Sequence, residues 1–178
     1  KPYKPKSKGI GNSQVLPKDY KIKSQIELVL SEMAEQVAIR LRRVKKKAKS
    51  VHIHISYSRI ESKKSINASK KINPTQSTKQ LTDHVLSLFR SKYNGGAVRS
   101  IAVRYDNLID DNLTIYTLFD DIEAIEKQRK IDKTLDTIRD KYGFLSVQNG
   151  SMLMEGSRVK ERSKLVGGHA GGMDGIIW

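Results

Sequence analysis

Cysteine is absent from this sequence of 178 residues, which excludes disulfide bonds and zinc sites built on thiolates. An intracellular location is compatible with that absence. Long hydrophobic runs are also missing, so no segment is predicted to cross a bilayer, and no leader resembles a signal peptide. A hydrophobic fraction of 37% still allows a buried core. The length indicates one domain, or one domain with an extension.

Acidic residues are scarce in the first part of the chain. Residues 1–105 hold 24 Lys and Arg against 6 Asp and Glu, a net charge of +18. Residues 106–178 hold 10 against 13, a net charge of −3. Because like-charge repulsion opposes folding, so basic a part indicates a polyanionic partner such as nucleic acid. The alternative is a basic surface that meets only solvent.

Hydrophobic periodicity predicts an α+β fold in the basic part. Apolar residues at three- and four-residue spacing predict helices over 24–46 and 77–93. Alternating patterns and turn signals predict strands over 8–15, 50–57, 65–73 and 97–105. The order β-α-β-β-α-β predicts a four-stranded antiparallel sheet with both helices on one face, a ferredoxin-like arrangement. A helical C-terminal extension follows, with an amphipathic helix at about 120–142. Residues 146–154 could form a strand, and the basic, glycine-rich sequence beyond Glu155 is expected to be a flexible tail.

The second face of this sheet has no predicted layer to cover it. The alternation places polar and basic residues there, none of them acidic: His52, His54, Ser56, Ser65, Asn67, Ser69, Lys71, Ser100 and Arg104. Hydroxyls and amides donate to phosphate oxygens, and Lys and Arg neutralise their charge. No aromatic residue falls on this face, whereas sheets that read RNA stack bases on exposed aromatics. The pattern therefore favours contact with a duplex backbone.

Several other polar patterns have two interpretations. The cations that end the first helix, from Arg40 to Lys47, suit a helix C-terminus and could equally contact phosphate. His52 and His54 could ligate zinc, but with no third ligand nearby they are better interpreted as polar face residues. His169 follows Gly167-Gly168, but the Lys and Ser/Thr of a Walker A motif are missing, which favours a flexible tail.

The acidic pairs Asp110-Asp111 and Asp120-Asp121 are the candidates for a catalytic metal site. The first is interpreted as part of a polar turn and the second as a helix N-cap. The sequence therefore predicts no catalytic residues, no metal site and no cofactor in this chain.

The order of local motifs resembles a known family. Lys8-Gly9-Ile10-Gly11-Asn12-Ser13-Gln14-Val15-Leu16, with the helices and strands after it, resembles the little-finger domain of Y-family translesion DNA polymerases. Phe119-Asp120-Asp121, the helix end Arg139-Asp140-Lys141-Tyr142-Gly143 and Ser157-Arg158 through Gly167-Gly168-His169 are similar to the C-terminal region of the UmuC/UvrX (ImpB/MucB/SamB) branch in Gram-positive bacteria.

The resemblance implies a basic linker at 1–7, a DNA-binding domain at 8–106 and a C-terminal extension at 107–178. The palm, fingers and thumb, with their Mg²⁺, would precede Lys1, so the parent protein would be a DNA polymerase acting in DNA repair and the SOS response in the bacterial cytoplasm, at the nucleoid. The little finger would grip primer-template duplex through the open sheet face and the first strand, with the contacts of that strand at Lys8, Asn12, Ser13 and Gln14.

The resemblance also implies a partner, because family members often bind the replication sliding clamp through a short peptide. The corresponding residues here are Ile115, Tyr116, Leu118 and Phe119, in which Ile and Tyr replace the Gln and Leu of the typical motif. The alternative for this segment is a hydrophobic staple before the following helix.

Two other classes of function fit part of the pattern. An RNA-binding α+β module would share the charge and the topology, and it predicts a preference for RNA and single strands. A structural or protein-interaction module would explain the amphipathic helix but leaves the acid-free sheet face unexplained.

Overall fold

A computed structural model describes residues 9–112, 116, 120–166 and 169–170. Its first six elements are β1 (Gly9–Tyr20), α1 (Lys23–Arg43), β2 (Lys46–Tyr57), β3 (Ile66–Thr75), α2 (Thr78–Lys92) and β4 (Val98–Asp106). This β-α-β-β-α-β order confirms the prediction from the sequence. A two-residue strand, β5 (Ile109–Asp110), was not predicted and pairs with the start of β2.

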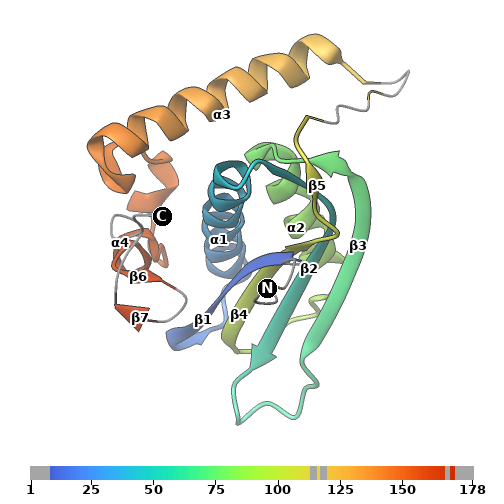
Figure 1. Cartoon of the computed structure of the whole chain (residues 1–178). Helices are drawn as coiled ribbons and strands as arrows, with labels where there is room; N and C mark the ends of the chain where they lie inside the picture. The colour runs from blue at the N-terminus through green and yellow to red at the C-terminus, as the bar shows by residue number, and fades with distance from the viewer. Residues whose placement is uncertain (1–8, 113–115, 117–119, 167–168, 171–178) are drawn as a thin grey trace, which may run out of the picture.

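The main sheet has the order β1-β4-β2-β3, and every neighbouring pair is antiparallel. β4 therefore lies between β1 and β2, and β1 and β3 form the two edges. α1 and α2 cover the same face of the sheet (Figure 1). The predicted antiparallel sheet with two helices on one face is confirmed.

The hydrophobic core lies between this face and the helices. α1 buries an apolar stripe at helical spacing that includes Ile26, Val29, Met33 and Val37. The strands supply alternate residues, and the deepest is Tyr105, whose hydroxyl donates to the carbonyl of Ala34 at 2.8 Å. Burial raises the pKa of the Tyr105 phenol far above its usual value. The remaining core residues on the strands include Leu16, Val51, Ile53, Ile55, Ile101 and Val103.

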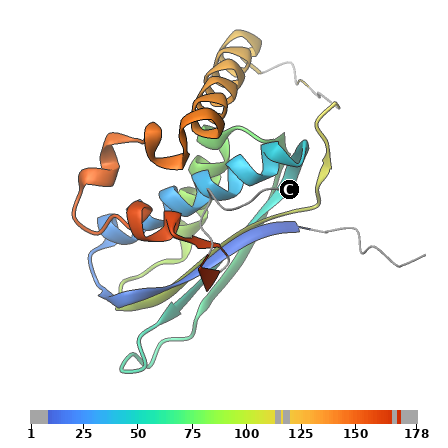
Figure 2. The same ribbon diagram turned by 60° about the vertical axis from the view of Figure 1, so that its left-hand side comes forward.

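The C-terminal extension begins with a long helix, α3 (Ile122–Tyr142), whose N-cap Asp121 accepts a hydrogen bond from the Ala124 amide at 3.0 Å. It continues through η1 (Phe144–Ser146), η2 (Gly150–Leu153), α4 (Val159–Ser163), β6 (Leu165–Val166) and β7 (His169–Ala170). Figure 2 shows that α3 and the segment from η1 to α4 lie on the helix side of the sheet. The described segment from α3 to α4 therefore leaves the second face of the sheet open.

Two element boundaries differ from the prediction. The first helix was expected to continue to Lys46 but ends at Arg43, because Lys45 adopts a positive φ of 53° and the chain turns into β2. Residues 146–154 were interpreted as a possible strand, but they form parts of two 3₁₀ helices. There Asn149 accepts a hydrogen bond from the Ser151 amide, a local turn that competes with a strand.

The tail after Glu155, expected to be flexible, makes specific contacts with the main domain as far as Lys164. This segment packs on α1 through a buried ion pair between Arg162 Nη2 and Glu32 Oε2, at 2.6 Å. Glu32 also accepts hydrogen bonds from the Ser157 hydroxyl at 2.5 Å and the Arg158 amide at 3.0 Å. Because burying a charge is costly unless it is paired, these contacts fix the segment in place.

Candidate nucleic-acid interface

The strand register places the predicted face residues side by side on the open face of the sheet. Each row crosses β1, β4, β2 and β3 in that order. The rows are Gly9, Asp106, Ser50 and Lys71; Gly11, Arg104, His52 and Ser69; Ser13, Ala102, His54 and Asn67; and Val15, Ser100 and Ser56. Ser65 joins the last row, with its hydroxyl 3.5 Å from that of Ser56. All nine residues predicted for this face therefore lie together, while their role in binding stays a prediction.

Two glycines on the edge strand make room for the guanidinium of this face. A Cβ built at Gly9 would lie 1.9 Å from Asp106 Oδ1 and 2.8 Å from Arg104 Nε, so the Arg104 and Asp106 side chains occupy the space above β1. A Cβ at Gly11 would lie 2.9 Å from the Val103 carbonyl oxygen. With no side chains at these positions, the Arg104 and Asp106 side chains can lie directly over the β1 backbone.

The open face has one acidic residue, which corrects the prediction of a face without carboxylates. β4 extends to Asp106, one residue beyond the predicted strand end, and its Oδ1 accepts a hydrogen bond from Arg104 Nε at 2.6 Å. Arg104 thus neutralises Asp106 at the end of the sheet near β5. A phosphate that binds Arg104 has to compete with this carboxylate.

Two histidines of β2 stand in the middle of the face, each with a hydrogen-bonding neighbour. His52 Nε2 contacts Asn67 Oδ1, and His54 Nε2 lies 3.0 Å from the Ser56 hydroxyl oxygen. Among the described residues, no three His, Cys, Asp or Glu side chains gather closely enough to hold a metal ion. The histidines are therefore part of a polar, hydrogen-bonded surface.

Two residues predicted to contact DNA point away from the open face. Asn12 and Gln14 pair with Val103 and Ile101, which are core residues, so their side chains start on the helix side of β1. Gln14 Oε1 accepts a hydrogen bond from Arg162 at 3.1 Å. Alternation along a strand explains this, because only Ser13 among the three faces outward. Lys8 lies outside the described residues.

Aromatic side chains lie behind the sheet, as the sequence predicted. Tyr57 and Tyr93 stack with ring centroids 6.5 Å apart, and Phe89 and Tyr93 with centroids 4.7 Å apart. The register rows of the open face contain no Phe, Tyr or Trp among the described residues. The face therefore offers hydrogen-bond donors and cations but no platform for stacking bases.

The edge strand β1 is held from behind by two guanidinium groups. Arg40 of α1 donates to the Gly11 carbonyl at 3.0 Å, and burial lowers the pKa of Arg40 from its ordinary value. Arg162 of α4 holds the side chain of Gln14 and contacts Gln36 of α1 at 3.0 Å. β1 is therefore braced by α1 and α4 from the helix side of the sheet.

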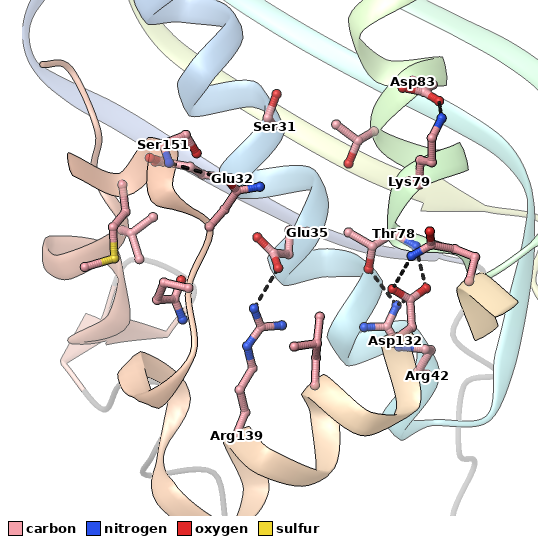
Figure 3. A pocket seen from close by; sticks show the side chains of 17 residues that line it. Ser31, Glu32, Glu35, Arg42, Thr78, Lys79, Asp83, Asp132, Arg139 and Ser151 are labelled. Atoms are coloured by element: carbon pink, nitrogen blue, oxygen red, sulfur yellow. Dashed lines mark hydrogen bonds and ion pairs between the residues drawn. The ribbon is translucent and has the colours of Figure 1, made fainter. Parts of the chain in front are cut away.

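The basic end of α1, which the sequence left open between two roles, is engaged by α3. Arg42 holds Asp136 through two hydrogen bonds, of 2.5 and 2.8 Å, and Arg43 donates to Asp140 at 2.7 Å. Asp132 accepts from the Thr78 amide at 3.1 Å, at the N-terminus of α2. Figure 3 shows Asp132 beside Arg42 and Thr78 at one end of a cavity of about 300 Å³.

The cavity of Figure 3 is lined by charged residues that already pair with one another. Arg139 donates to Glu35 at 2.8 Å, and Lys79 donates to Asp83 at 2.8 Å. The first pair joins α3 to α1, and the second lies within α2. Their geometry explains the packing of α3 and gives no catalytic arrangement.

The acidic pairs have structural contacts rather than a shared metal geometry. Asp110 pairs with Lys46 at 2.5 Å, and Asp121 caps α3. The described residues thus do not fit a Mg²⁺ site of the kind that polymerase chemistry needs. In the predicted clamp-binding segment, Tyr116 is exposed and donates to Glu126 at 2.9 Å. Ile115, Leu118 and Phe119 lie outside the described residues, as do Gly167 and Gly168.

Sequence reasoning missed the docking of α4 on α1. The available signal was Glu32 and Gln36, two polar residues four positions apart within the buried stripe of the first helix. Buried polar groups need partners, and Arg162 supplies one for both. Periodicity within the helix could have indicated that Glu32 and Gln36 require polar partners, but it could not identify Arg162 as the residue that supplies them. None of the helices among the described residues has the length and apolarity needed to span a membrane.

Comparison with known proteins identifies the family. Residues 7–118 match the model of the impB/mucB/samB family C-terminal domain. The chain is 34% identical over 160 residues to a protein of Bacillus subtilis (strain 168) named "Putative UV-damage repair protein UvrX", covering 89% of this chain and 38% of the relative. It is 29% identical over 165 residues to "DNA polymerase IV 2" of Halalkalibacterium halodurans, covering 92% of this chain and 40% of the relative.

The chain therefore spans about two fifths of the length of these relatives. The family match covers well over half of the chain, from β1 through β4 and β5, and the similarity to the relatives continues into the extension. We conclude that the chain belongs to the impB/mucB/samB family and contains its C-terminal domain.

Proposed function

We propose that this chain binds the sugar-phosphate backbone of duplex DNA through the open face of its sheet. In the whole protein it acts as the little finger of a Y-family DNA polymerase that copies damaged DNA during repair. The names of the relatives, DNA polymerase IV and a UV-damage repair protein, support this role. This chain binds the primer-template, and the catalytic domain of the whole protein carries out the polymerase reaction.

The observation that carries the proposal is the composition of the open face. Sixteen positions in four rows combine small hydroxyls, two histidines, an amide, Lys71 and Arg104, with Asp106 as the one carboxylate. Such a face can donate many hydrogen bonds to phosphate oxygens at short range. The part of the extension from α3 to α4 lies on the other side of the sheet (Figure 2).

Partners other than DNA follow from the same proposal. The palm, fingers and thumb of the same protein would place the domain over the duplex, and the SOS response and the nucleoid would be its setting. The segment from Ile115 to Phe119 would be the contact for the sliding clamp. An RNA-binding module is the alternative, and the lack of aromatic residues on the face counts against it.

Neutralising the two cations of the open face is expected to weaken DNA binding and to reduce its salt dependence. Each lost phosphate contact lowers the slope of log K against log salt by about 0.9, so Lys71→Gln with Arg104→Gln should lower it by about 1 to 2. At 0.1 M salt the affinity should fall by about tenfold or more. Fluorescence anisotropy with a labelled primer-template over a salt series measures both quantities.

A charge-matched control separates a local site from bulk charge. Lys92→Gln with Lys130→Gln removes the same two charges from exposed positions on α2 and α3. The open-face variant should lose several times more affinity than this control, with DNA of any sequence. Equal losses in both variants, or tighter binding to duplex RNA than to DNA, would contradict the proposal.

A further inference from the structure

A groove of about 1470 Å³ separates α3 from β3 and the N-terminal half of α2, and its two walls differ in charge. The wall formed by the main domain carries mostly cations: Arg42, Arg43, Lys45, Lys47, Lys71 and Lys79, with Asp83 and Asp111. The α3 wall carries mostly carboxylates: Asp120, Asp121, Glu126, Asp132, Asp136 and Asp140, with Lys127, Arg129 and Lys133. α3 thus presents an acidic surface to a basic one.

The packing of α3 on the main domain is polar rather than apolar. Asp132 and Arg139 are its buried residues, and both are charged. Of its apolar side chains, Ile125, Leu135 and Ile138 are only half-buried, and Ile122 (51% exposed), Ile131 (42%) and Tyr142 (66%) stay in solvent. A helix of a globular domain ordinarily buries an apolar stripe. No apolar side chain of α3 is fully buried, and ion pairs to α1, which salt and competing anions weaken, form much of its contact with the main domain.

The carboxylates of α3 occupy positions that suit phosphate oxygens. Asp132, Asp136 and Asp140 recur every four residues, about 6 Å apart along the helix axis. Asp136 fills the fork of the Arg42 guanidinium, with hydrogen bonds of 2.5 and 2.8 Å. A guanidinium fork recognises carboxylate and phosphate in the same bidentate geometry. The anion in this fork is supplied by the chain itself.

We propose that α3 covers a second DNA-binding surface, formed by the basic end of α1 and the residues beside it. The three carboxylates stand where backbone phosphates bind after α3 has been displaced. Lys71 belongs both to the open face and to this groove, so the second surface continues the first. The inference rests on the proposed function for the identity of the ligand.

Neutralising the covering carboxylates in the full chain tests this inference. Asp132→Asn, Asp136→Asn and Asp140→Asn together should tighten binding to duplex DNA at 0.1 M salt by about tenfold or more. The control Glu123→Gln, Glu155→Gln and Glu161→Gln removes three exposed carboxylates outside the groove. It should produce a clearly smaller gain. When Arg42→Gln and Arg43→Gln are added to the first variant, its gain in DNA affinity should fall to that of the control.

Amide hydrogen exchange of the unmodified chain gives a second test that needs no variant. Addition of DNA at low salt should accelerate exchange in α3 from Ile131 to Asp140 by several-fold while β2 and β4 stay protected. Unchanged or slower exchange in α3 would overturn the inference, and so would a gain in affinity no larger than that of the control.

The outcomes separate this inference from the proposed function. Normal DNA binding with α3 still protected leaves the open-face proposal intact and rejects the second surface. If the triple variant binds DNA and the unmodified chain does not, the open face is not a sufficient DNA-binding site, and the covered surface is supported. No binding by either protein rejects both.

Discussion

Replacing Arg162 by leucine is expected to destabilise the protein by about 3–5 kcal/mol, because it leaves a buried carboxylate without its counter-charge. The side chains of Arg162 and Glu32 are 3% and 5% exposed, and their closest atoms are 2.6 Å apart. Arg162 also bridges Gln36 of α1 and Gln14 of β1. Its loss therefore loosens α4 from the helix and the edge strand together. Urea unfolding followed by circular dichroism measures the change.

Two further variants identify the cause of this loss. Lys160→Leu changes an exposed cation of the same helix and should alter the stability by less than about 0.5 kcal/mol. Glu32→Leu combined with Arg162→Leu removes both charges and should recover a large part of the stability, since a buried ion pair is often replaceable by apolar residues. A stability of Arg162→Leu equal to that of the unmodified chain would contradict the integral role of the C-terminal segment.

Introducing valine at Gly11 is expected to cost about 1–3 kcal/mol and to abolish tight DNA binding. A Cβ there lies 2.9 Å from the carbonyl oxygen of Val103 and 3.0 Å from Arg104 Cβ. The first of these atoms is backbone, so β1 has to move away from β4. That movement disturbs the row of Gly11, Arg104 and His52 and displaces the Arg104 side chain, a cation of the proposed binding face.

Ser13→Val is the matched control, because Ser13 lies two residues along the same strand and on the same face. Ser13 is exposed, and valine suits a strand, so stability should stay within about 0.5 kcal/mol. Thermal unfolding and the anisotropy assay would be applied to both variants. Because Ser13 also lies on the proposed binding face, the comparison is made on stability. Equal losses of stability for valine at Gly11 and at Ser13 would contradict the close packing of Gly11 against β4.

The sequence predicted the sheet and its helices because both depend on local periodicity. The alternation of Val51, Ile53 and Ile55 gives one face to the core, so the polar residues between them had to face outward. The same rule applied to β1 would have placed Asn12 and Gln14 on the helix side. Those two residues were assigned to DNA contact by family resemblance, not by strand parity.

Long-range polar pairing could not be predicted from the sequence. α1 ends at Arg43 because Lys45 has a positive φ, and this φ is set by the turn into β2 rather than by the helical periodicity of the sequence. Likewise, the spacing of Asp132, Asp136 and Asp140 is readable on a helix, but nothing local indicates that Arg42 and Arg43 receive them. Interactions between residues about a hundred positions apart depend on packing, which periodicity does not encode.

The central claim, that DNA lies on the open face, can be tested most directly by thiol protection. Because the chain has no cysteine, Ser69→Cys places a single thiol on the exposed face of β3, and Ser87→Cys places one on exposed α2. Saturating duplex DNA at low salt should slow maleimide modification of the first thiol by about tenfold or more, which is the protection expected of a buried contact. The second thiol should react at its free rate. Equal reactivity of the two thiols in the presence of bound DNA, or protection of the α2 thiol alone, would contradict the account.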